Sequence, residues 1–171
     1  IVYGPLGTPS NSAIQKYLNT KKVPQLFVAT GATKWNDPKD FPWTMGWQPN
    51  YQSEGRIYAN YLLKEKPNAK IGILYQNDDY GKDYLKGIKD GLGKKGASMI
   101  VAEESYETSV PTIDSQVVAL KSKGADVFIS IHCNANDNHD PHGTETFVMG
   151  LHKTDANLKT AQRENASILL E

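Results

Sequence analysis

The segment PNAKIGILYQNDDYGKDYLKGIKDGL, residues 67–92, decides the fold class of this chain. Its part AKIGILYQ, at 69–76, is a nearly continuous apolar run, which is typical of a strand buried on both faces of a parallel sheet. The following residues predict a helix over about 80–95, because apolar side chains recur there at helical spacing: Tyr84, Leu85, Ile88 and Leu92. A strand that leads directly into an amphipathic helix is the beginning of a βαβ unit.

The same alternation extends along the chain in both directions. We expect further strands at 1–4, 23–30, 98–106, 125–132 and 144–150, and further helices at about 12–21, 50–65, from Thr112 onward, and at about 155–170. Strands separated by helices imply parallel pairing with right-handed crossovers. The predicted fold class is therefore α/β, a three-layer sandwich with a mainly parallel sheet of Rossmann-like or flavodoxin-like type, built from βαβ units.

The loops at the carboxyl ends of the strands are the expected functional edge, since ligands gather there in parallel sheets. Five loops meet this description: 5–10, 30–37, 76–81, 106–111 and 132–143. Several of them carry glycine and small hydroxyl residues, which let a backbone approach a ligand closely.

Composition excludes several classes of partner. The chain has 171 residues, in which 19 Lys and Arg balance 19 Asp and Glu, and no basic run suggests a nucleic-acid partner. Its apolar runs are far shorter than the roughly 20 residues of a membrane-spanning helix, so we expect no membrane insertion. The single cysteine, Cys133, excludes an intrachain disulfide, and we expect it to be either a small buried residue or, beside a histidine, a reactive thiol.

Most of the chain, from residue 1 to about 128, resembles the type I periplasmic solute-binding proteins of ABC transporters. The branch that it resembles binds branched-chain amino acids and aromatic carboxylates. The segments that carry the resemblance are GPLGTPSN (4–11), VPQLFVATGATKWND (23–37), the long run from FPWTMGW to KDGL (41–92) and ETSVPTIDSQVVALKSKGADVF (107–128). The resemblance implies two α/β lobes that close on a small carboxylate or amino-acid ligand.

The resemblance also implies ligand-binding residues by position: Thr8, Ser10, Gly31, Ala32, Thr33 and Tyr80. Hydroxyls and backbone N–H groups of the first two loops would bind the carboxylate, and the tyrosine would approach from the other lobe. Each has a structural alternative. The first two would cap a helix, the glycine would form a turn, and the tyrosine would pack at a helix start. The three tryptophans (Trp35, Trp43 and Trp47) are expected to be core or lobe-joining residues.

From about residue 126 the chain resembles a second family, the zinc-dependent N-acetylmuramoyl-L-alanine amidases. Three short motifs carry this likeness: SIHCNA (130–135), GTE (143–145) and REN (163–165). The resemblance implies that His132 is a zinc ligand. No histidine precedes it and the family's catalytic glutamate would lie beyond residue 171, so we expect no catalytic residue, no enzyme activity and no cofactor, with zinc possible at His132. His139 and His142 would either join an adventitious metal site or lie solvated in a loop.

The two resemblances predict a composite chain. We divide it into residues 1–48, a partial lobe-one segment, and 49–171, a composite α/β domain whose amidase-like segment occupies about 129–171. The hypothesis is a recombinant, engineered chimera joined at about 126–131, because one buried parallel strand serves both families and no linker separates them. An unpaired sheet edge predicts a homo-oligomer.

The predicted function is a solute-binding-protein-derived module with weak or no activity. The alternatives are a zinc amidase fragment acting on peptidoglycan, and a designed chain without a selected function. Both parent families act in the periplasm or the cell envelope. This chain begins with the strand-like IVYG and not with a signal peptide, so we expect it to be made in the cytoplasm.

Overall fold

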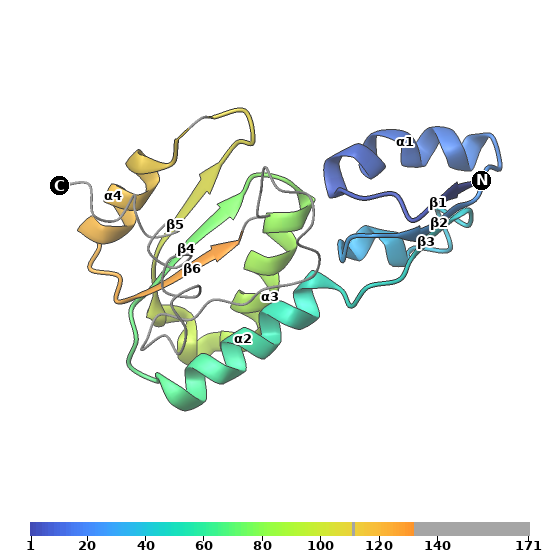
Figure 1. Ribbon diagram of the computed structural model, residues 1–171. Helices are drawn as coiled ribbons and strands as arrows, with labels where there is room; N and C mark the ends of the chain where they lie inside the picture. The colour runs from blue at the N-terminus through green and yellow to red at the C-terminus, as the bar shows by residue number, and fades with distance from the viewer. Residues whose placement is uncertain (111, 132–171) are drawn as a thin grey trace, which may run out of the picture.

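The computed structural model describes residues 1–110 and 112–131, which form two parallel sheets (Figure 1). The first sheet has the strand order β1-β2-β3 and the second has the order β5-β4-β6. The strands are β1 (Val2–Tyr3), β2 (Gln25–Val28), β3 (Thr44–Gly46), β4 (Ile71–Gln76), β5 (Ile100–Tyr106) and β6 (Val127–Ile131). Strands and helices alternate and every pairing is parallel, which confirms the predicted α/β fold class.

Six helical segments connect the strands of the described part. They are α1 (Thr8–Thr20), η1 (Thr33–Asn36), α2 (Tyr51–Glu65), α3 (Asp79–Gly96), η2 (Ala97–Met99) and α4 (Asp114–Ser122). We call the first sheet with α1 and η1 the first lobe, and the second sheet with α2, α3 and α4 the second lobe. Figure 1 shows the two lobes side by side, joined by the chain that runs from β3 into α2.

Helices cover both faces of the second sheet. Alternate residues of a strand point to opposite faces, and β4 shows both surroundings. Ile71 and Ile73 belong to the buried cluster that includes Ile88 of α3. A side chain at Gly72, between them, would instead meet Leu120 of α4. The second lobe is therefore a three-layer sandwich with α2 and α3 on one side and α4 on the other (Figure 1).

Helices α2 and α3 touch through glycines. A Cβ atom at Gly87 would lie 2.3 Å from the carbonyl oxygen of Gln52, and one at Gly55 would lie 2.7 Å from the carbonyl oxygen of Tyr84. These distances are too short for any side chain, so the two backbones come closer than helices with larger residues allow. This contact fixes which residues of α2 face which residues of α3.

A polar network holds α1 on the first sheet. Gln25 of β2 is fully buried and donates its amide to Oδ1 of Asn11 over 2.8 Å, while Oγ1 of Thr44 donates to Oε1 of Gln25 over 3.1 Å. Asn11 in turn donates to the carbonyl oxygen of Gly7 over 2.8 Å. Buried amides need such partners, because an unpaired buried polar group costs about 1–3 kcal/mol.

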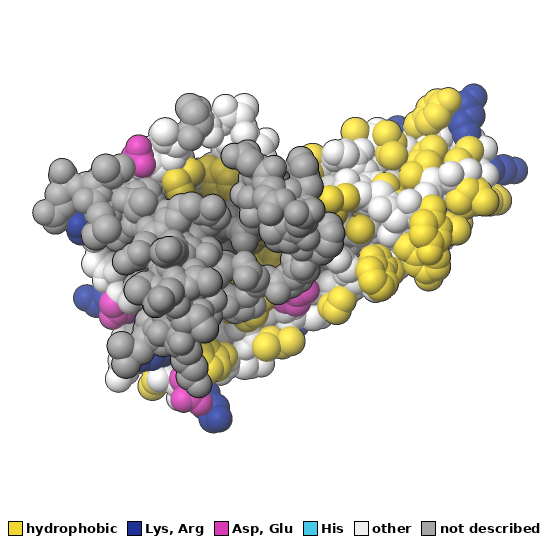
Figure 2. All heavy atoms as spheres, viewed as in Figure 1, with side chains coloured by type: hydrophobic (Ala, Val, Ile, Leu, Met, Phe, Trp, Pro, Cys, Tyr) yellow, Lys and Arg dark blue, Asp and Glu magenta, His cyan; other side chains and the backbone are white. Residues whose placement is uncertain are grey.

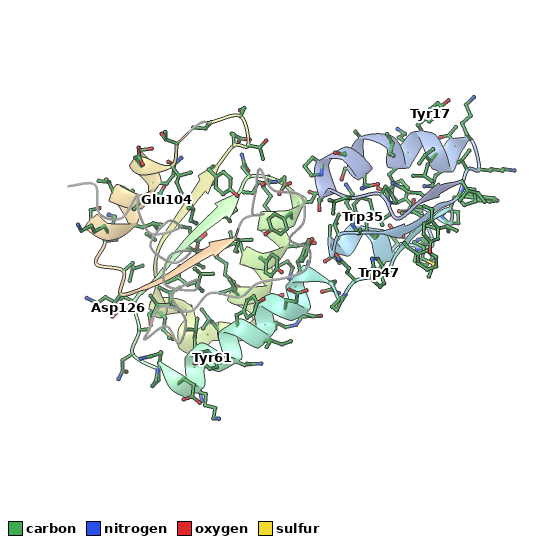
Figure 3. All side chains as sticks on the ribbon, in the orientation of Figure 1. Tyr17, Trp35, Trp47, Tyr61, Glu104 and Asp126 are labelled. Atoms are coloured by element: carbon green, nitrogen blue, oxygen red, sulfur yellow. The ribbon has the colours of Figure 1, made fainter. Side chains whose placement is uncertain are left out.

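The opposite face of the first sheet is apolar and exposed. Tyr3 is 75% exposed, Met45 is 48% exposed and Trp47 is 65% exposed, and the ring of Tyr3 meets that of Phe27 edge to face at 5.3 Å. Figure 2 shows hydrophobic side chains gathered over this lobe. Trp35 is buried, as expected of a core residue, whereas Trp47 projects outward (Figure 3), so of the two expected places, core or lobe junction, the core is excluded for Trp47.

The start of α1 also differs from the prediction. A helix was expected from about residue 12, with hydroxyl caps before it, but α1 begins at Thr8 with Gly7 as N-cap and no side-chain cap. The reason is Pro9, whose fixed φ suits the first turn of a helix and whose missing N–H is not needed there. The interpretation of Thr8 and Ser10 as caps is therefore wrong.

Two expectations lie outside the described residues, namely the strand at 144–150 and the helix at about 155–170. Within residues 1–110 and 112–131, no helix combines the length and the apolar character that crossing a bilayer requires.

Candidate functional site

Two buried threonines and a tryptophan meet beyond the carboxyl end of β2. Thr8, at the start of α1, is 4% exposed, and Thr30, two residues after β2, is 3% exposed. Oγ1 of Thr8 donates to Oγ1 of Thr30 over 2.8 Å, and the indole Nε1 of Trp35 donates to the same Thr30 oxygen over 2.7 Å. We call these three residues the hydroxyl cluster.

Counting protons shows that the hydroxyl cluster is incomplete. Each threonine hydroxyl has one proton and two lone pairs, and an indole N–H only donates. The two hydroxyls share one hydrogen bond, which uses one of their two protons. Of the described residues, none accepts the other proton, whichever hydroxyl carries it. A buried hydroxyl donor is therefore left for an acceptor atom outside the described protein groups.

Gly31 and Ala32 form the floor of the same loop. A Cβ atom at Gly31 would lie 2.4 Å from the carbonyl oxygen of Pro49 and 2.8 Å from the ring of Tyr51. The carbonyl oxygen of Gly31 accepts the N–H of Tyr51 over 2.8 Å. Ala32 is 1% exposed and packs against Trp35. Both predicted residues lie beside the hydroxyl cluster, and their contacts join the loop to the beginning of α2.

Thr33 connects this loop to the second lobe. Its backbone N–H donates to Oδ2 of Asp83 over 2.6 Å, and Nε2 of Gln52 donates to Oδ1 of the same carboxylate over 2.7 Å. The side-chain oxygen of Thr33 is buried and has no partner within the described part of the chain. The adjacent Lys34 forms an ion pair of 2.9 Å with Asp79.

Tyr80 belongs to an aromatic group on α2 and α3. Its ring meets that of Tyr51 edge to face at 5.0 Å and that of Tyr84 at 5.5 Å, and it is half-buried. Since Tyr51 also touches Gly31, the aromatic group reaches from the second lobe to the loop of the first. The packing expected at the helix start is thus present, and the ring stands beside the predicted loop.

Burial and a nearby carboxylate change the acidity of this aromatic group. Burial is the largest cause that raises the pKa of Tyr84, and the hydrogen bond that its hydroxyl donates to Glu54 raises it further. Burial also raises the pKa of Tyr58, followed by the negative charge of Glu54. Both phenols remain protonated at neutral pH.

Ser10 differs from the other predicted ligand-binding residues in its exposure. It is exposed within α1, whereas Thr8 is buried. It takes part in none of the hydrogen bonds described for the hydroxyl cluster. The structure thus brings Thr8 together with the 31–33 loop, and it leaves Ser10 on the surface.

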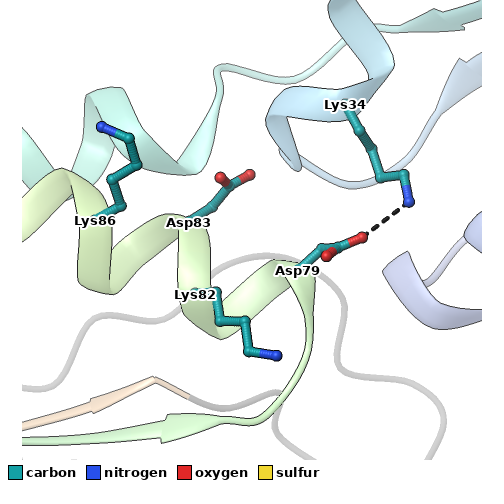
Figure 4. A pocket seen from close by; sticks show the side chains of 5 residues that line it. All are labelled: Lys34, Asp79, Lys82, Asp83 and Lys86. Carbon is teal, nitrogen blue, oxygen red and sulfur yellow. Dashed lines mark hydrogen bonds and ion pairs between the residues drawn. The ribbon is translucent and has the colours of Figure 1, made fainter.

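A hollow of about 410 Å³ opens beside Thr33, between η1 and α3 (Figure 4). Charged side chains line it: Lys34, Asp79, Lys82, Asp83 and Lys86. None of the six predicted ligand-binding residues lines it. Its wall nevertheless includes Asp83, the residue that binds the Thr33 N–H.

The predicted zinc residues His132, His139 and His142 lie outside the described residues. Within residues 1–110 and 112–131, no group of three or more His, Cys, Asp or Glu side chains is arranged to hold a metal ion.

The sequence did not reveal several residues of the site. Thr30, Tyr51 and Asp83 were not singled out, and each owes its place to a partner far away in the chain. The only available signal was the position of Thr30 at the end of the predicted strand 23–30, where the predicted loop 30–37 begins.

Comparison with known families identifies the class of protein. A family model described as periplasmic binding protein matches residues 1–138. The chain belongs to this family of periplasmic and extracellular binding proteins, whose role is binding and not catalysis. The match passes the predicted boundary at about residue 128 and includes His132.

Solved structures agree on the fold. A periplasmic binding protein from Burkholderia mallei superimposes with a TM-score of 0.65 at 14% identity, over 77% of this chain and 34% of that chain. A substrate-binding periplasmic protein from Ralstonia solanacearum superimposes with a TM-score of 0.61 at 27% identity, over 76% of this chain and 36% of that chain.

Curated relatives come from both families that the sequence resembles. Leu/Ile/Val-binding protein homolog 7 of Brucella suis is 32% identical over 71 residues, which are 42% of this chain and 18% of the relative. N-acetylmuramoyl-L-alanine amidase LytC of Bacillus subtilis is 31% identical over 83 residues, which are 48% of this chain and 16% of the relative. The chain thus spans less than a fifth of these relatives.

Proposed function

We propose that the chain binds a small carboxylate of the amino-acid class against the hydroxyl cluster, with Tyr80 facing it from α3. The observation that carries this proposal is the hydroxyl proton of Thr8 and Thr30 that lacks an acceptor. Family membership and the name of the Brucella relative support an amino-acid ligand.

A carboxylate suits this donor because it is an acceptor only and its charge strengthens each hydrogen bond that it receives. The buried Trp35 orients Thr30, so the hydroxyl does not have to be ordered when the ligand arrives. The described donors supply only one or two hydrogen bonds to a charged group, each contributing about 1.5–3 kcal/mol. We therefore expect an affinity near the millimolar range, which corresponds to about 4 kcal/mol.

Calorimetric titration with leucine and benzoate at millimolar concentration tests the proposal. The double variant Thr8→Val/Thr30→Val should abolish the heat of binding, because either substitution alone leaves the other hydroxyl with a proton to donate. Thr20→Val, which removes an exposed hydroxyl at the end of α1, should leave binding unchanged. Absence of heat from the unaltered protein with both ligands would reject the proposal.

The composite origin is a second part of the proposal. In this part an amidase-derived segment begins at about residue 129 and is joined near 126–131 to binding-protein residues, with the first lobe ending near residue 48. The identity with LytC supports kinship with an amidase, but its 83 residues exceed the 43 residues of 129–171, so that kinship also extends before the junction. A zinc amidase fragment acting on peptidoglycan is the second candidate function. Release of dye-labelled peptidoglycan fragments with added zinc tests it, and His132→Ala should abolish any release.

Self-association is the third part of the proposal. Among the described strands, β1 and β3 each pair with β2 alone, so two edges of a three-stranded sheet are open to a second copy. Light scattering over a range of protein concentrations should show a dimer or a larger species. A constant monomer mass at high concentration would reject this part.

A further inference from the structure

Asp83 stands between the two lobes and binds a group from each. Its Oδ2 accepts the backbone N–H of Thr33 in the first lobe over 2.6 Å, and its Oδ1 accepts the side-chain amide of Gln52 in the second lobe over 2.7 Å. We infer that Asp83 is a positioning residue, which holds the 30–33 loop and through it the hydroxyl cluster in the form that receives a ligand. This inference rests on the proposed function of the cluster.

The place of Asp83 is fixed from the second lobe. Gly87 lies one helical turn after it on α3, and the absence of a side chain there lets the backbone of Gln52 approach within 2.3 Å of the Cβ position. The close contact of the helices brings the Gln52 amide to Asp83. A carboxylate held in this way loses little freedom when it binds the Thr33 N–H.

The effect of Asp83 reaches the cluster through a short, buried stretch of chain. Thr33 is separated from Thr30 by Gly31 and Ala32, both buried, and the side chain of Trp35 returns to Thr30 over 2.7 Å. A shift of the Thr33 backbone therefore moves either the indole or the hydroxyl at the other end of this hydrogen bond. The two hydrogen bonds of Asp83 go to Thr33 and Gln52 and not to the cluster itself, so its role is to place and not to bind.

Asp79 is the natural control, because it also lies on α3 and also contacts the 33–36 segment. The Asp79 side chain, which forms an ion pair with Lys34, is 53% exposed, and exposed ion pairs contribute little to stability. Asp79→Ala should therefore leave the loop in place. Asp83→Asn is the conservative variant, since an asparagine oxygen still accepts the Thr33 N–H and the Gln52 amide can turn to present its oxygen.

The test compares Asp83→Ala, Asp83→Asn and Asp79→Ala in the full chain by two-dimensional amide NMR without ligand. Asp83→Ala should shift the Trp35 indole N–H signal, assigned with Trp35→Phe, and speed hydrogen exchange of the Thr33 amide. The other two variants should leave both signals near their original positions. Unchanged signals in Asp83→Ala, or equal changes in Asp79→Ala, would overturn the inference.

Ligand titration adds the functional arm. Asp83→Ala should weaken leucine binding at least about fivefold, the lower end of typical coupling between sites, while Asp83→Asn retains most of the affinity. Equal loss in both variants would overturn the inference, because it would mean that the charge of Asp83 contacts the ligand. If neither the unaltered protein nor any variant binds leucine but the NMR signals respond as stated, the proposed function fails and the positioning role of Asp83 stands.

Discussion

Replacing Thr30 by valine should destabilise the chain more than Thr8→Val or Thr30→Ser does. Valine keeps the shape of threonine and removes the oxygen that accepts the Trp35 indole and the Thr8 hydroxyl. Two donors that are almost fully buried then lose their acceptor. An unsatisfied buried donor costs about 1–3 kcal/mol, so for two donors we expect a total loss of about 2–6 kcal/mol in the free energy of unfolding.

The two neighbouring variants should cost less. Thr8→Val removes one hydrogen bond and leaves the Trp35 indole paired with Thr30, so we expect a loss of about 1 kcal/mol. Thr30→Ser keeps the acceptor and loses only a methyl group, which again costs about 1 kcal/mol. The comparison of these variants therefore tests the hydrogen-bond acceptor of Thr30 and not the volume of its side chain.

Urea unfolding followed by circular dichroism measures these differences. With a slope of about 2 kcal/mol per molar urea, Thr30→Val should lower the midpoint by about 1–3 M, and the other two variants by about 0.5 M. The slope itself should stay constant if only the folded state changes. Equal midpoints for Thr30→Val and Thr8→Val would refute the assignment of Thr30 as the shared acceptor.

Two further predictions concern the second lobe. Gly87→Ala should lower the free energy of unfolding by about 2 kcal/mol, because overpacking against the Gln52 backbone outweighs the gain of about 1 kcal/mol in helix propensity. Urea midpoints measure this loss, and a variant as stable as the parent protein would contradict the prediction. The free energy of unfolding should also fall as the pH rises above about 10. The raised pKa of Tyr84 keeps this phenol protonated in the folded state, while the tyrosine of the unfolded chain ionises. The contribution of Tyr84 to stability is therefore complete below the pKa of the unfolded tyrosine and is lost as the pH rises above it. Melting temperatures across this range should show a smaller decline in Tyr84→Phe, and an identical decline would show that other groups cause it.

Local sequence patterns predicted the second lobe well. The apolar run at 69–76 became β4 (Ile71–Gln76), and the helical spacing after it became α3 (Asp79–Gly96). In this lobe the spacing of apolar residues reflects burial directly. A strand covered on both faces is apolar throughout, and a helix that packs on one face of a sheet has one apolar side. The resemblance to binding proteins added the family, which residues 1–138 confirm.

The structure of the first lobe and of the site depends on contacts that the spacing of apolar residues in the sequence does not reveal. Its sheet is covered by α1 through the buried amides of Gln25 and Asn11, which a hydrophobic pattern does not show. The bond between Thr33 and Asp83 joins residues 50 positions apart. The structure places Thr8 against Thr30, the residue that precedes the 31–33 loop. The roles that the resemblance gave to these residues remain proposals, because partners across the fold decide whether a residue binds, packs or positions.

The tight contact around Gly31 has a consequence for reading and redesigning such chains. Its φ is not in the left-handed region, so glycine is required here by the space that Pro49 and Tyr51 occupy and not by the backbone angle. Selection for folded protein from a library of variants at Gly31 should retain almost only glycine. A designer would mistake this intolerance of substitution for a role in ligand recognition. Any graft that moves this loop to another scaffold must carry residues 49–51 at the start of α2 with it, since the two segments pack as one unit.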